Sequence, residues 1–246
     1  MPDLLFADPD LAALYDPMCP RQERDDFDFY LPLIMAARAV LDVGCGTGSL
    51  LAEARAAGHT RRLCGLDPAC GMLGQAQKHT GIEWVLGDLR STGWQAEFDL
   101  VVMTGHAFQV LVDNAEIRAA LIAIRKALKP GGRFAFETRN PEAKEWERWT
   151  TDRPVEIASA GGLSAQMTRH VTVPFDGRTV TFVHTFSGAG FGKPQICRST
   201  LRFLSVAELT AFLDEAGFVI DHQFGDWDRS PVTLASPEII TIARAG

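Results

Sequence analysis

The stretch VLDVGCGTGSL at residues 40–50 ends an apolar run with Gly44, Gly46 and Gly48. A strand-to-helix turn of such small residues leaves backbone N–H groups free and lets a ligand approach closely, which suits nucleotide binding. The dinucleotide fingerprint GxGxxG would need a glycine at position 49, where this chain has Ser49, so the case for NAD is weakened but not removed. Because glycines also mark ordinary turns, the interpretation depends on the residues that follow.

Two acidic residues stand at the ends of the next two apolar runs. Asp67, in GLDP, is placed to accept hydrogen bonds from both hydroxyls of an adenosine ribose, although it also suits the N-cap of a helix starting near Ala69. Asp88, in VLGDL, suits an adenine amino group with the Leu89 N–H on a ring nitrogen, and a loop acid is otherwise a cap. Parallel strands bind ligands at their carboxyl ends, so the glycines and both acids predict one adenosine site.

A histidine follows the fourth apolar run, in MTGHAFQVL. Histidine is the side chain best suited to take a proton from an amine or hydroxyl near neutral pH, which makes His106 the candidate general base. A packing or solvent-exposed loop histidine is the alternative. Thr104, Phe108 and Gln109 share this segment and are expected to line the same pocket.

The elements that must position these residues alternate between strand-like and helical patterns. AVLDV, RLCGL, IEWVL, FDLVVM and RFAFET are short β-rich runs separated by segments of helix length. This alternation predicts βαβ units and a parallel sheet with helices on both faces. Near the C-terminus, SVAELTAFLDEAGF predicts a helix with a capping box of Ser205 and Glu208 that closes at Gly217, and two last strands follow it.

Residues 154–203 break this rhythm and contain no good helical pattern. QMTRHVTVPFDGRTVTFVHTF has two β-like arms around Asp176-Gly177, which predicts a two-residue hairpin turn. The register pairs three sets of residues: Val173 with Val180, Val171 with Phe182, and Arg169 with His184. One face is then mostly apolar and suited to burial, whereas the other is rich in threonine and faces water.

Composition limits the classes of protein. The chain has 246 residues, 46% hydrophobic and 22% charged, which favours one large α/β domain with a sizeable core. A net charge of −7 without a basic patch disfavours a nucleic-acid partner. The acidic N-terminus is no secretory signal, and no run of about 18 apolar residues could span a membrane. Five cysteines without CxxC or zinc-like spacing predict reduced thiols, no metal site and a cytoplasmic location.

Five segments, in order, resemble the motifs of class I S-adenosylmethionine-dependent methyltransferases of the small-molecule type. They are VLDVGCGTG, GLDPACGML, GDL, FDLVVM and LKPGGRFAFET, and the resemblance covers residues 35–140 and 205–244. It implies methyl transfer from S-adenosyl-L-methionine to a small-molecule acceptor by in-line displacement. It also implies an α/β fold: a Rossmann-like doubly wound sheet of seven strands, the last antiparallel, with an antiparallel β insertion after the fifth strand.

The resemblance also implies roles for individual residues. The backbone of Gly44–Gly46 would hold the methionine moiety, Asp67 the ribose, and Asp88 with Leu89 the adenine edge, while Met72 would pack near the adenine or in the helix core. The complete set of expected cofactor residues is Asp42, Gly44, Cys45, Gly46, Asp67, Pro68, Met72, Asp88, Leu89, Met103 and Thr104.

Four parts are expected along the chain: an N-terminal helical lid at 1–38, a cofactor-binding core at 39–150, a β insertion that roofs the substrate at 151–204, and the end of the core at 205–246. Tyr15 and Tyr30 of the lid are candidates to touch cofactor or acceptor, with helix packing as the alternative. Phe108, Arg169 and His184 complete the substrate candidates. Arg169 would suit an anionic group on the acceptor, although a surface ion pair explains it equally well.

The acceptor stays open, as does methylation at nitrogen, oxygen or carbon, the use of a general base, and a possible homodimer. The segment after the fourth strand lacks the Asn/Asp-Pro-Pro-aromatic sequence typical of methyltransferases that act on amino groups of bases, which disfavours DNA and RNA. Two alternatives remain: an NAD-dependent oxidoreductase and a non-catalytic, S-adenosylmethionine-binding regulatory domain.

Overall fold

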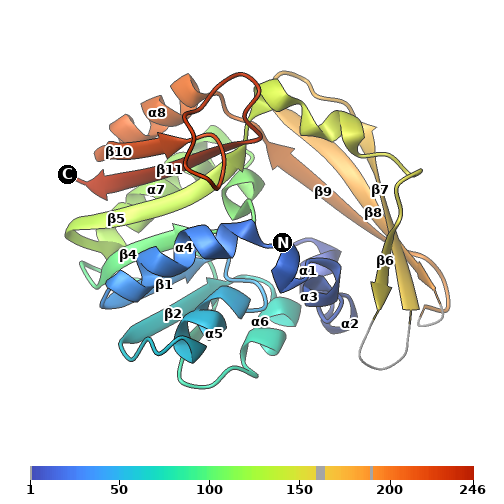
Figure 1. Ribbon diagram of the computed structural model, residues 1–246, viewed down its shortest axis with the longest axis horizontal. Coiled ribbons are helices and arrows are strands. Elements are labelled where there is room, and N and C mark those ends of the chain that lie inside the picture. Colours follow the sequence, from blue (N-terminus) through green and yellow to red (C-terminus); the bar gives the residue numbers. More distant parts are fainter. Residues whose placement is uncertain (1, 159–163, 189–190) are drawn as a thin grey trace.

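The computed structural model describes residues 2–158, 164–188 and 191–246, which form two β-sheets (Figure 1). The larger sheet has seven strands in the order β10-β11-β5-β4-β1-β2-β3, and the smaller has four in the order β6-β7-β8-β9. The strands are β1 (Ala39–Val43), β2 (Arg62–Asp67), β3 (Glu83–Leu86), β4 (Phe98–Met103), β5 (Leu128–Arg139), β6 (Val155–Ala158), β7 (Ser164–Val173), β8 (Thr179–Gly188), β9 (Gln195–Arg202), β10 (Phe218–Phe224) and β11 (Glu238–Ala245). This architecture confirms the predicted fold class.

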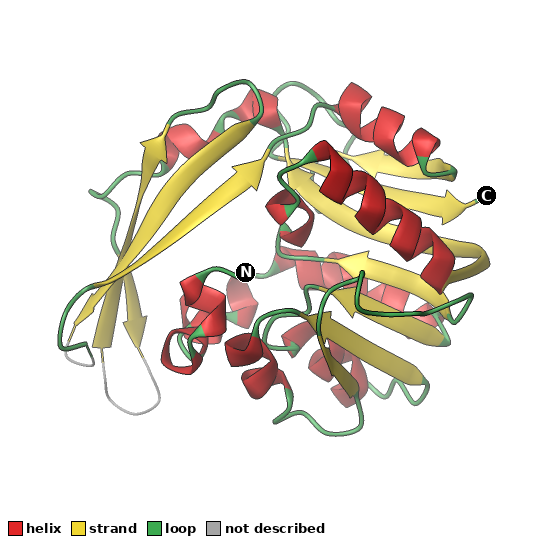
Figure 2. Ribbon diagram, turned by 180° about the vertical axis from the view of Figure 1, so that it is seen from behind, coloured by secondary structure: helices red, strands yellow, loops and turns green. Residues whose placement is uncertain are grey.

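Helices cover both faces of the seven-stranded sheet, as Figures 1 and 2 show from opposite sides. The helices of the described residues are α1 (Leu4–Ala7), α2 (Pro9–Ala12), α3 (Tyr15–Met18), α4 (Asp25–Ala36), α5 (Ser49–Ala56), α6 (Cys70–Ala76), α7 (Asn114–Ala127) and α8 (Val206–Glu215), with the short 3₁₀ helices η1 (Arg21–Glu23), η2 (Ala107–Val110), η3 (Pro141–Ala143) and η4 (Glu145–Arg148). Leu121 of α7 and Leu213 of α8 belong to one apolar cluster, whereas Ile34 of α4 and Leu51 of α5 belong to another. All five residues of β1 are buried because it lies between these clusters.

The final strand, β11, runs against the other strands of the larger sheet. The predicted capping box of α8 is confirmed: Ser205 Oγ accepts from the Glu208 N–H, and Glu208 accepts from the Ser205 N–H at 2.9 Å. β11 then runs antiparallel to both β5 and β10 and pairs Glu238 with Arg139. The first residue of β11 therefore lies at the edge where the parallel strands end.

The second sheet contains the predicted hairpin, with one error in its register. Two predicted pairs are confirmed: Arg169 with His184, and Val171 with Phe182. Val173, however, pairs with Thr181 and not with Val180, because the register shifts between Val171 and Val173. The predicted two-residue turn is also wrong. Residues 174–178 connect the strands, and the Asp176 carboxylate accepts from the Thr179 N–H at 2.7 Å to hold this longer turn.

The N-terminal helices α1–α3 lie between the two sheets (Figure 1). Leu5, Leu11 and Leu14 pack in one cluster with Ile157 of β6 and Phe186 of β8, so the N-terminal helices cover the apolar side of the second sheet. On the other side, the backbone carbonyls of residues 6–8 meet α6 at Gly71, where a Cβ would lie 2.7–2.8 Å from them. No helix in the described ranges is long and apolar enough to cross a membrane.

Candidate active site

The glycine turn between β1 and α5 is tied to the end of β2. Gly44 and Gly46 have φ values of +74° and +55°, a left-handed conformation that favours glycine. The Gly46 N–H donates to Asp67 Oδ2 at 2.8 Å, and the Ala69 N–H donates to Asp67 Oδ1 at 2.8 Å. The structure therefore brings the predicted turn and the predicted ribose acid together, and Asp67 also anchors the start of α6.

The third glycine has a packing role that the sequence pattern did not reveal. A Cβ on Gly48 would lie 2.3 Å from the indole of Trp84, and one on Gly65 would lie 2.4 Å from the same ring. Trp84 comes from β3 and also donates from Nε1 to the His79 carbonyl at 3.0 Å. Gly48 thus makes room for a side chain of the protein, in addition to its positive φ of +76°.

A second acid lies deeply buried beside this turn. Asp42, at the end of β1, is 1% exposed, and its Oδ1 has no hydrogen-bond partner among the described residues. Burial, helped by the neighbouring Asp67 and Glu137, raises the pKa of Asp42 to about 8. Burial also raises the pKa of Asp67. Two desolvated carboxyl groups at one sheet edge favour a ligand that brings positive charge or hydrogen-bond donors.

The adenine candidates lie around the same edge. Met72 is buried and packs with Ala12 and Ala69, so it contacts the N-terminal helices. Asp88 is more exposed, and hydrogen bonds from Arg90 lower its pKa. The other expected cofactor residues differ in burial: Leu89, Met103 and Thr104 are buried, Cys45 is half-buried, and Pro68 is exposed.

His106 is held by two buried carboxylates from neighbouring strands. Its backbone N–H donates to Glu137 Oε1 at 2.7 Å, and its Nε2 lies 3.0 Å from both oxygens of Glu238. His106 has a φ of +62°, which is uncommon for a residue with a side chain. Because a carboxylate only accepts hydrogen bonds, Nε2 carries a proton in this pair, and in the neutral imidazole Nδ1 then has the lone pair.

Two predicted substrate residues are not in the lining of the cavity described below. Tyr30, in α4, is fully buried, and its hydroxyl donates to Glu137 Oε2 at 2.5 Å, so it helps to hold the carboxylate that accepts from the His106 N–H. Phe108, in η2, is 1% exposed and packs against Phe136 with ring centroids 4.6 Å apart. Tyr15 does lie near the site, because its hydroxyl is next to Gly105, and burial raises the pKa of Tyr15 to about 12.

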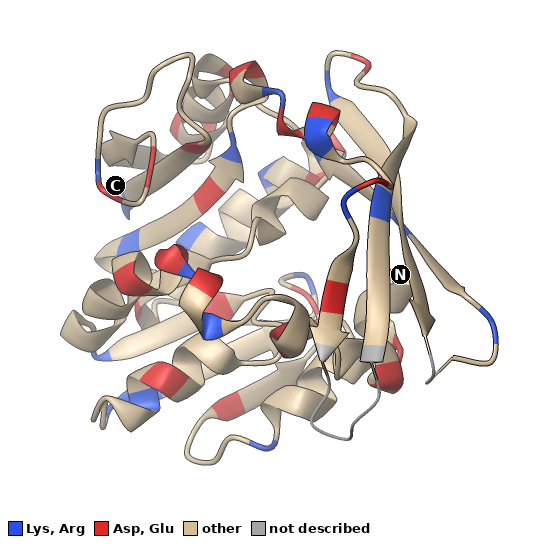
Figure 3. Cartoon of the chain, turned by 45° about the vertical axis from the view of Figure 1, so that its right-hand side comes forward, with Lys and Arg blue, Asp and Glu red and all other residues tan. Residues whose placement is uncertain are grey.

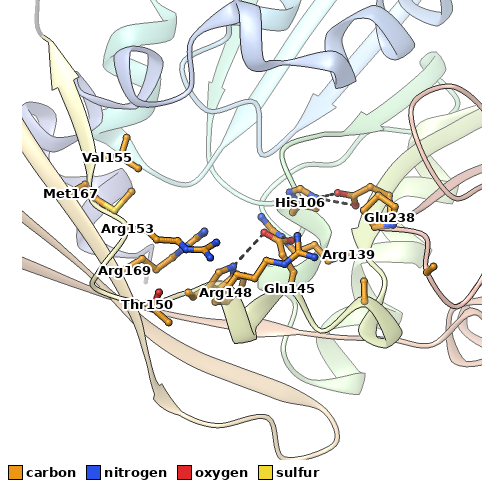
Figure 4. A pocket seen from close by; sticks show the side chains of 14 residues that line it. His106, Arg139, Glu145, Arg148, Thr150, Arg153, Val155, Met167, Arg169 and Glu238 are labelled. Atoms are coloured by element: carbon orange, nitrogen blue, oxygen red, sulfur yellow. Dashed lines mark hydrogen bonds and ion pairs between the residues drawn. The ribbon is translucent and has the colours of Figure 1, made fainter.

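A cavity of about 520 Å³ opens between the two sheets beside His106 (Figure 4). It is lined by His106, Arg139, Ala143, Glu145, Arg148, Trp149, Thr150, Arg153, Val155, Met167, Arg169, Ala235, Pro237 and Glu238. Many of these residues come from the connection between β5 and β6, along which basic and acidic positions alternate (Figure 3). Arg169, predicted from the hairpin, is therefore in the same cavity as His106.

The centre of the cavity wall is an arginine that the sequence reasoning missed. Arg139, the last residue of β5, pairs with Glu145 at 2.6 Å and donates to Gln109 Oε1 at 3.0 Å. His184 lies behind Arg169 on β8. Burial, together with Arg169 and Arg139, lowers the pKa of His184 to about 4, so it is neutral at physiological pH.

Known proteins resemble this chain in sequence and in fold. A family model described as a methyltransferase domain matches residues 40–132. Cypemycin N-terminal methyltransferase from Streptomyces sp. is 32% identical over 181 residues, which are 73% of this chain and 65% of that protein. The CcbJ methyltransferase from Streptomyces caelestis superposes with a TM-score of 0.73 at 19% identity, covering 92% of this chain and 97% of that one. CalS10, an amino pentose methyltransferase from Micromonospora echinaspora, gives 0.69 at 23% identity, covering 95% of both chains.

Residues 40–132 are a methyltransferase domain, and the chain has the fold of the class I S-adenosylmethionine-dependent methyltransferases. S-adenosylmethionine is the methyl donor of this family of enzymes. The structural matches have low sequence identity, so they establish only the fold of this chain. The matched residues cover 65%, 45% and 65% of the three curated relatives, so the chain spans less than two thirds of their length.

The residues around the glycine turn fit S-adenosylmethionine. Each Asp67 oxygen accepts one backbone N–H at 2.8 Å and retains a lone pair for a ribose hydroxyl. Asp42 offers a carboxyl group with an unpartnered oxygen, which suits a ligand with cationic groups. Glu137 and Glu238, the carboxylates that hold His106, were not predicted from the sequence, although a polar residue at the end of an apolar strand such as RFAFET was a usable signal.

Proposed function

We propose that this methyltransferase transfers a methyl group from S-adenosylmethionine to a small-molecule acceptor held in the cavity beside His106. The supporting observation is that a histidine paired with Glu238 lines a cavity of about 520 Å³ at the sheet edge that also carries the glycine turn and Asp67. Pockets of roughly 300–1,000 Å³ are typical for small molecules.

The cofactor would be held by the first turn and the acids around it. We infer that Gly44–Gly46 face the methionine part, Asp67 the ribose, and Asp88 with Leu89 the adenine edge. Bound there, S-adenosylmethionine supplies a methyl carbon on a sulfonium that is already a good leaving group. The protein's own task is then to orient the acceptor and to exclude water, and orientation of this kind contributes up to roughly 7–11 kcal/mol.

The N-terminal helices and the second sheet are proposed to provide that exclusion. Asp16 of α3 accepts from Thr47 Oγ1 at 2.6 Å and from Ser49 Oγ at 3.0 Å, so α3 is fastened over the glycine turn. Met167 and Arg169 of β7 line the cavity from the opposite side. This arrangement supports the role of residues 1–38 as a lid and of 151–204 as a roof.

His106 is proposed to take the proton that the acceptor loses. S-adenosylmethionine, held by the glycine turn and Asp67, would supply the methyl group and keep the electron pair on its sulfur. His106 Nδ1 would accept the N–H or O–H proton that the acceptor loses when its nitrogen or oxygen takes the methyl group. Glu238 stabilises the imidazolium through Nε2. General-base assistance of this kind contributes about 10²–10⁴ in rate.

Among the relatives, cypemycin N-terminal methyltransferase and the amino pentose methyltransferase CalS10 have names that point to amine acceptors. A primary or secondary amine is therefore the first class of acceptor to test, and hydroxyl compounds are the second, since a ubiquinone biosynthesis O-methyltransferase is 33% identical over 116 residues.

The test measures formation of S-adenosylhomocysteine with a library of small amines and hydroxyl compounds, together with calorimetric binding of S-adenosylhomocysteine. For the acceptor found, His106→Ala should lower kcat by about 10²–10⁴ and leave cofactor affinity unchanged. His79→Ala, beyond α6 and outside the site, is the matched control. A kcat within twofold of wild type in His106→Ala would refute the assignment of His106 as the general base. Cofactor binding with no turnover of any acceptor would favour a non-catalytic role.

A further inference from the structure

Arg169 places a positive charge in the cavity without a protein carboxylate bound to it. Its guanidinium carbon lies 4.6 Å from the centroid of the Trp149 ring, which fixes the side chain by a cation–π contact. Figure 4 shows it pointing into the cavity from β7. Among the described residues, no hydrogen bond or ion pair within 4.0 Å joins Arg169 to an acidic side chain, so its donors are available to a ligand.

The neighbouring arginine differs in this respect. Arg139 is paired with Glu145 at 2.6 Å and donates to Gln109 at 3.0 Å, so its charge is already compensated. The single glutamate between the two arginines is therefore committed to Arg139. Burial and the repulsion from Arg139 lower the pKa of Arg169 to about 10 and outweigh the attraction of Glu145, which is bonded to Arg139.

The remaining charges of the cavity act in the same direction. Four arginines and two glutamates line it, which leaves two more positive than negative charges, in a chain whose net charge is −7. Arg153, which precedes β6, lies beside Arg169 at this end of the cavity (Figure 4). His184, whose pKa is lowered, adds no charge. An anion is thus the ligand that this end of the cavity stabilises.

We propose that the methyl acceptor carries an oxyanion, a carboxylate or a phosphate, that binds Arg169 while its nucleophilic end lies at His106. In Figure 4, Arg153 and Arg169 occupy one end of the cavity and His106 with Glu238 the other, with Arg139 and Glu145 between them. The acceptor is then bifunctional, with an anionic group at one end and an amine or hydroxyl at the other. This inference rests on the proposed methyl transfer and names the class of its substrate.

The experiment titrates inorganic phosphate and acetate into the full-length protein by calorimetry, with and without saturating S-adenosylhomocysteine. At least one anion should bind, and Arg169→Gln should weaken it by roughly tenfold or more, because a charge-assisted hydrogen bond is lost. Arg198→Gln removes the same charge from the exposed outer side of β9 and should leave the affinity unchanged. Preference for phosphate or for acetate identifies the anionic group.

Retained cofactor affinity in Arg169→Gln shows that the variant is folded. If Arg169→Gln has lost cofactor affinity, Arg153→Gln, which changes an exposed side chain, is used in its place and should also weaken anion binding. No binding of either anion up to about 50 mM, or equal binding by the Arg169 and Arg198 variants, would overturn the proposal. Failure of methyl transfer itself is recognised separately, because it leaves the anion titration unaffected.

Discussion

Glu137 offers a quantitative test of how the site is supported. This carboxyl group is fully buried, accepts from the Tyr30 hydroxyl at 2.5 Å and from the His106 N–H at 2.7 Å, and its pKa is raised by burial from 4.5 to about 6. A difference of about 1.5 pKa units corresponds to about 2 kcal/mol of folding free energy. Between about pH 4.5 and 6 the folded state binds more protons than the unfolded state, so stability falls as pH rises, and the full penalty is present above pH 6.

Two variants separate the charge of Glu137 from its hydrogen bonds. Glu137→Gln keeps an oxygen that accepts from the His106 N–H, and its NH₂ group can donate to the Tyr30 hydroxyl oxygen, which reverses that hydrogen bond. Because the variant has no charge here, it should be more stable than wild type by up to about 2 kcal/mol at pH 8 and about equal near pH 4.5. Glu137→Ala leaves both groups unpaired and creates a cavity. It should therefore be less stable than wild type at pH 5 by about 2–4 kcal/mol.

Denaturation with urea at pH 5 and pH 8, followed by fluorescence, measures both effects. The quantity to compare is the difference in unfolding free energy between variant and wild type, because other groups titrate in the same range and cancel in that difference. A difference for Glu137→Gln that is the same at both pH values would refute the buried-charge argument. Destabilisation of Glu137→Gln as large as that of Glu137→Ala would refute the hydrogen-bond geometry.

Two further substitutions test the glycine turn and its acid. Asp67→Ala should weaken S-adenosylhomocysteine binding by roughly tenfold to a hundredfold in calorimetry, since hydrogen bonds to a charged group contribute about 1.5–3 kcal/mol each, and an unchanged dissociation constant would argue against the ribose assignment. Gly48→Ala should destabilise the protein by about 2–4 kcal/mol, because Gly48 has a positive φ and an added Cβ would clash with Trp84. Gly46→Ala should cost only about 1–2 kcal/mol, because a Cβ there meets open space. Similar shifts in the thermal unfolding temperature of the two variants would contradict this explanation.

Local patterns in the sequence were sufficient for the elements and for the first half of the site. Strand ends, the glycine turn, Asp67 and the capping box of Ser205 all depend on neighbours within a few residues, and the structure has them where the pattern predicts. The register error at Val173 arose because a bulge depends on both strands and leaves no mark in one of them. The hydrogen bond of Tyr30 to Glu137 was not predicted, because a tyrosine in a helical pattern gives no indication of which buried acid it will meet.

The second half of the site could not be read from local patterns, because it depends on strand order. His106 follows β4, Glu137 lies near the end of β5, and Glu238 begins β11, and these three strands are adjacent in the sheet although 132 positions separate His106 from Glu238. The antiparallel direction of β11 is what brings its first residue, and not its last, to the edge where the parallel strands end. A parallel final strand would present Ala245 there and leave His106 without its carboxylate. In this chain the reversed strand is therefore a requirement of the proposed general base as well as a feature of the fold.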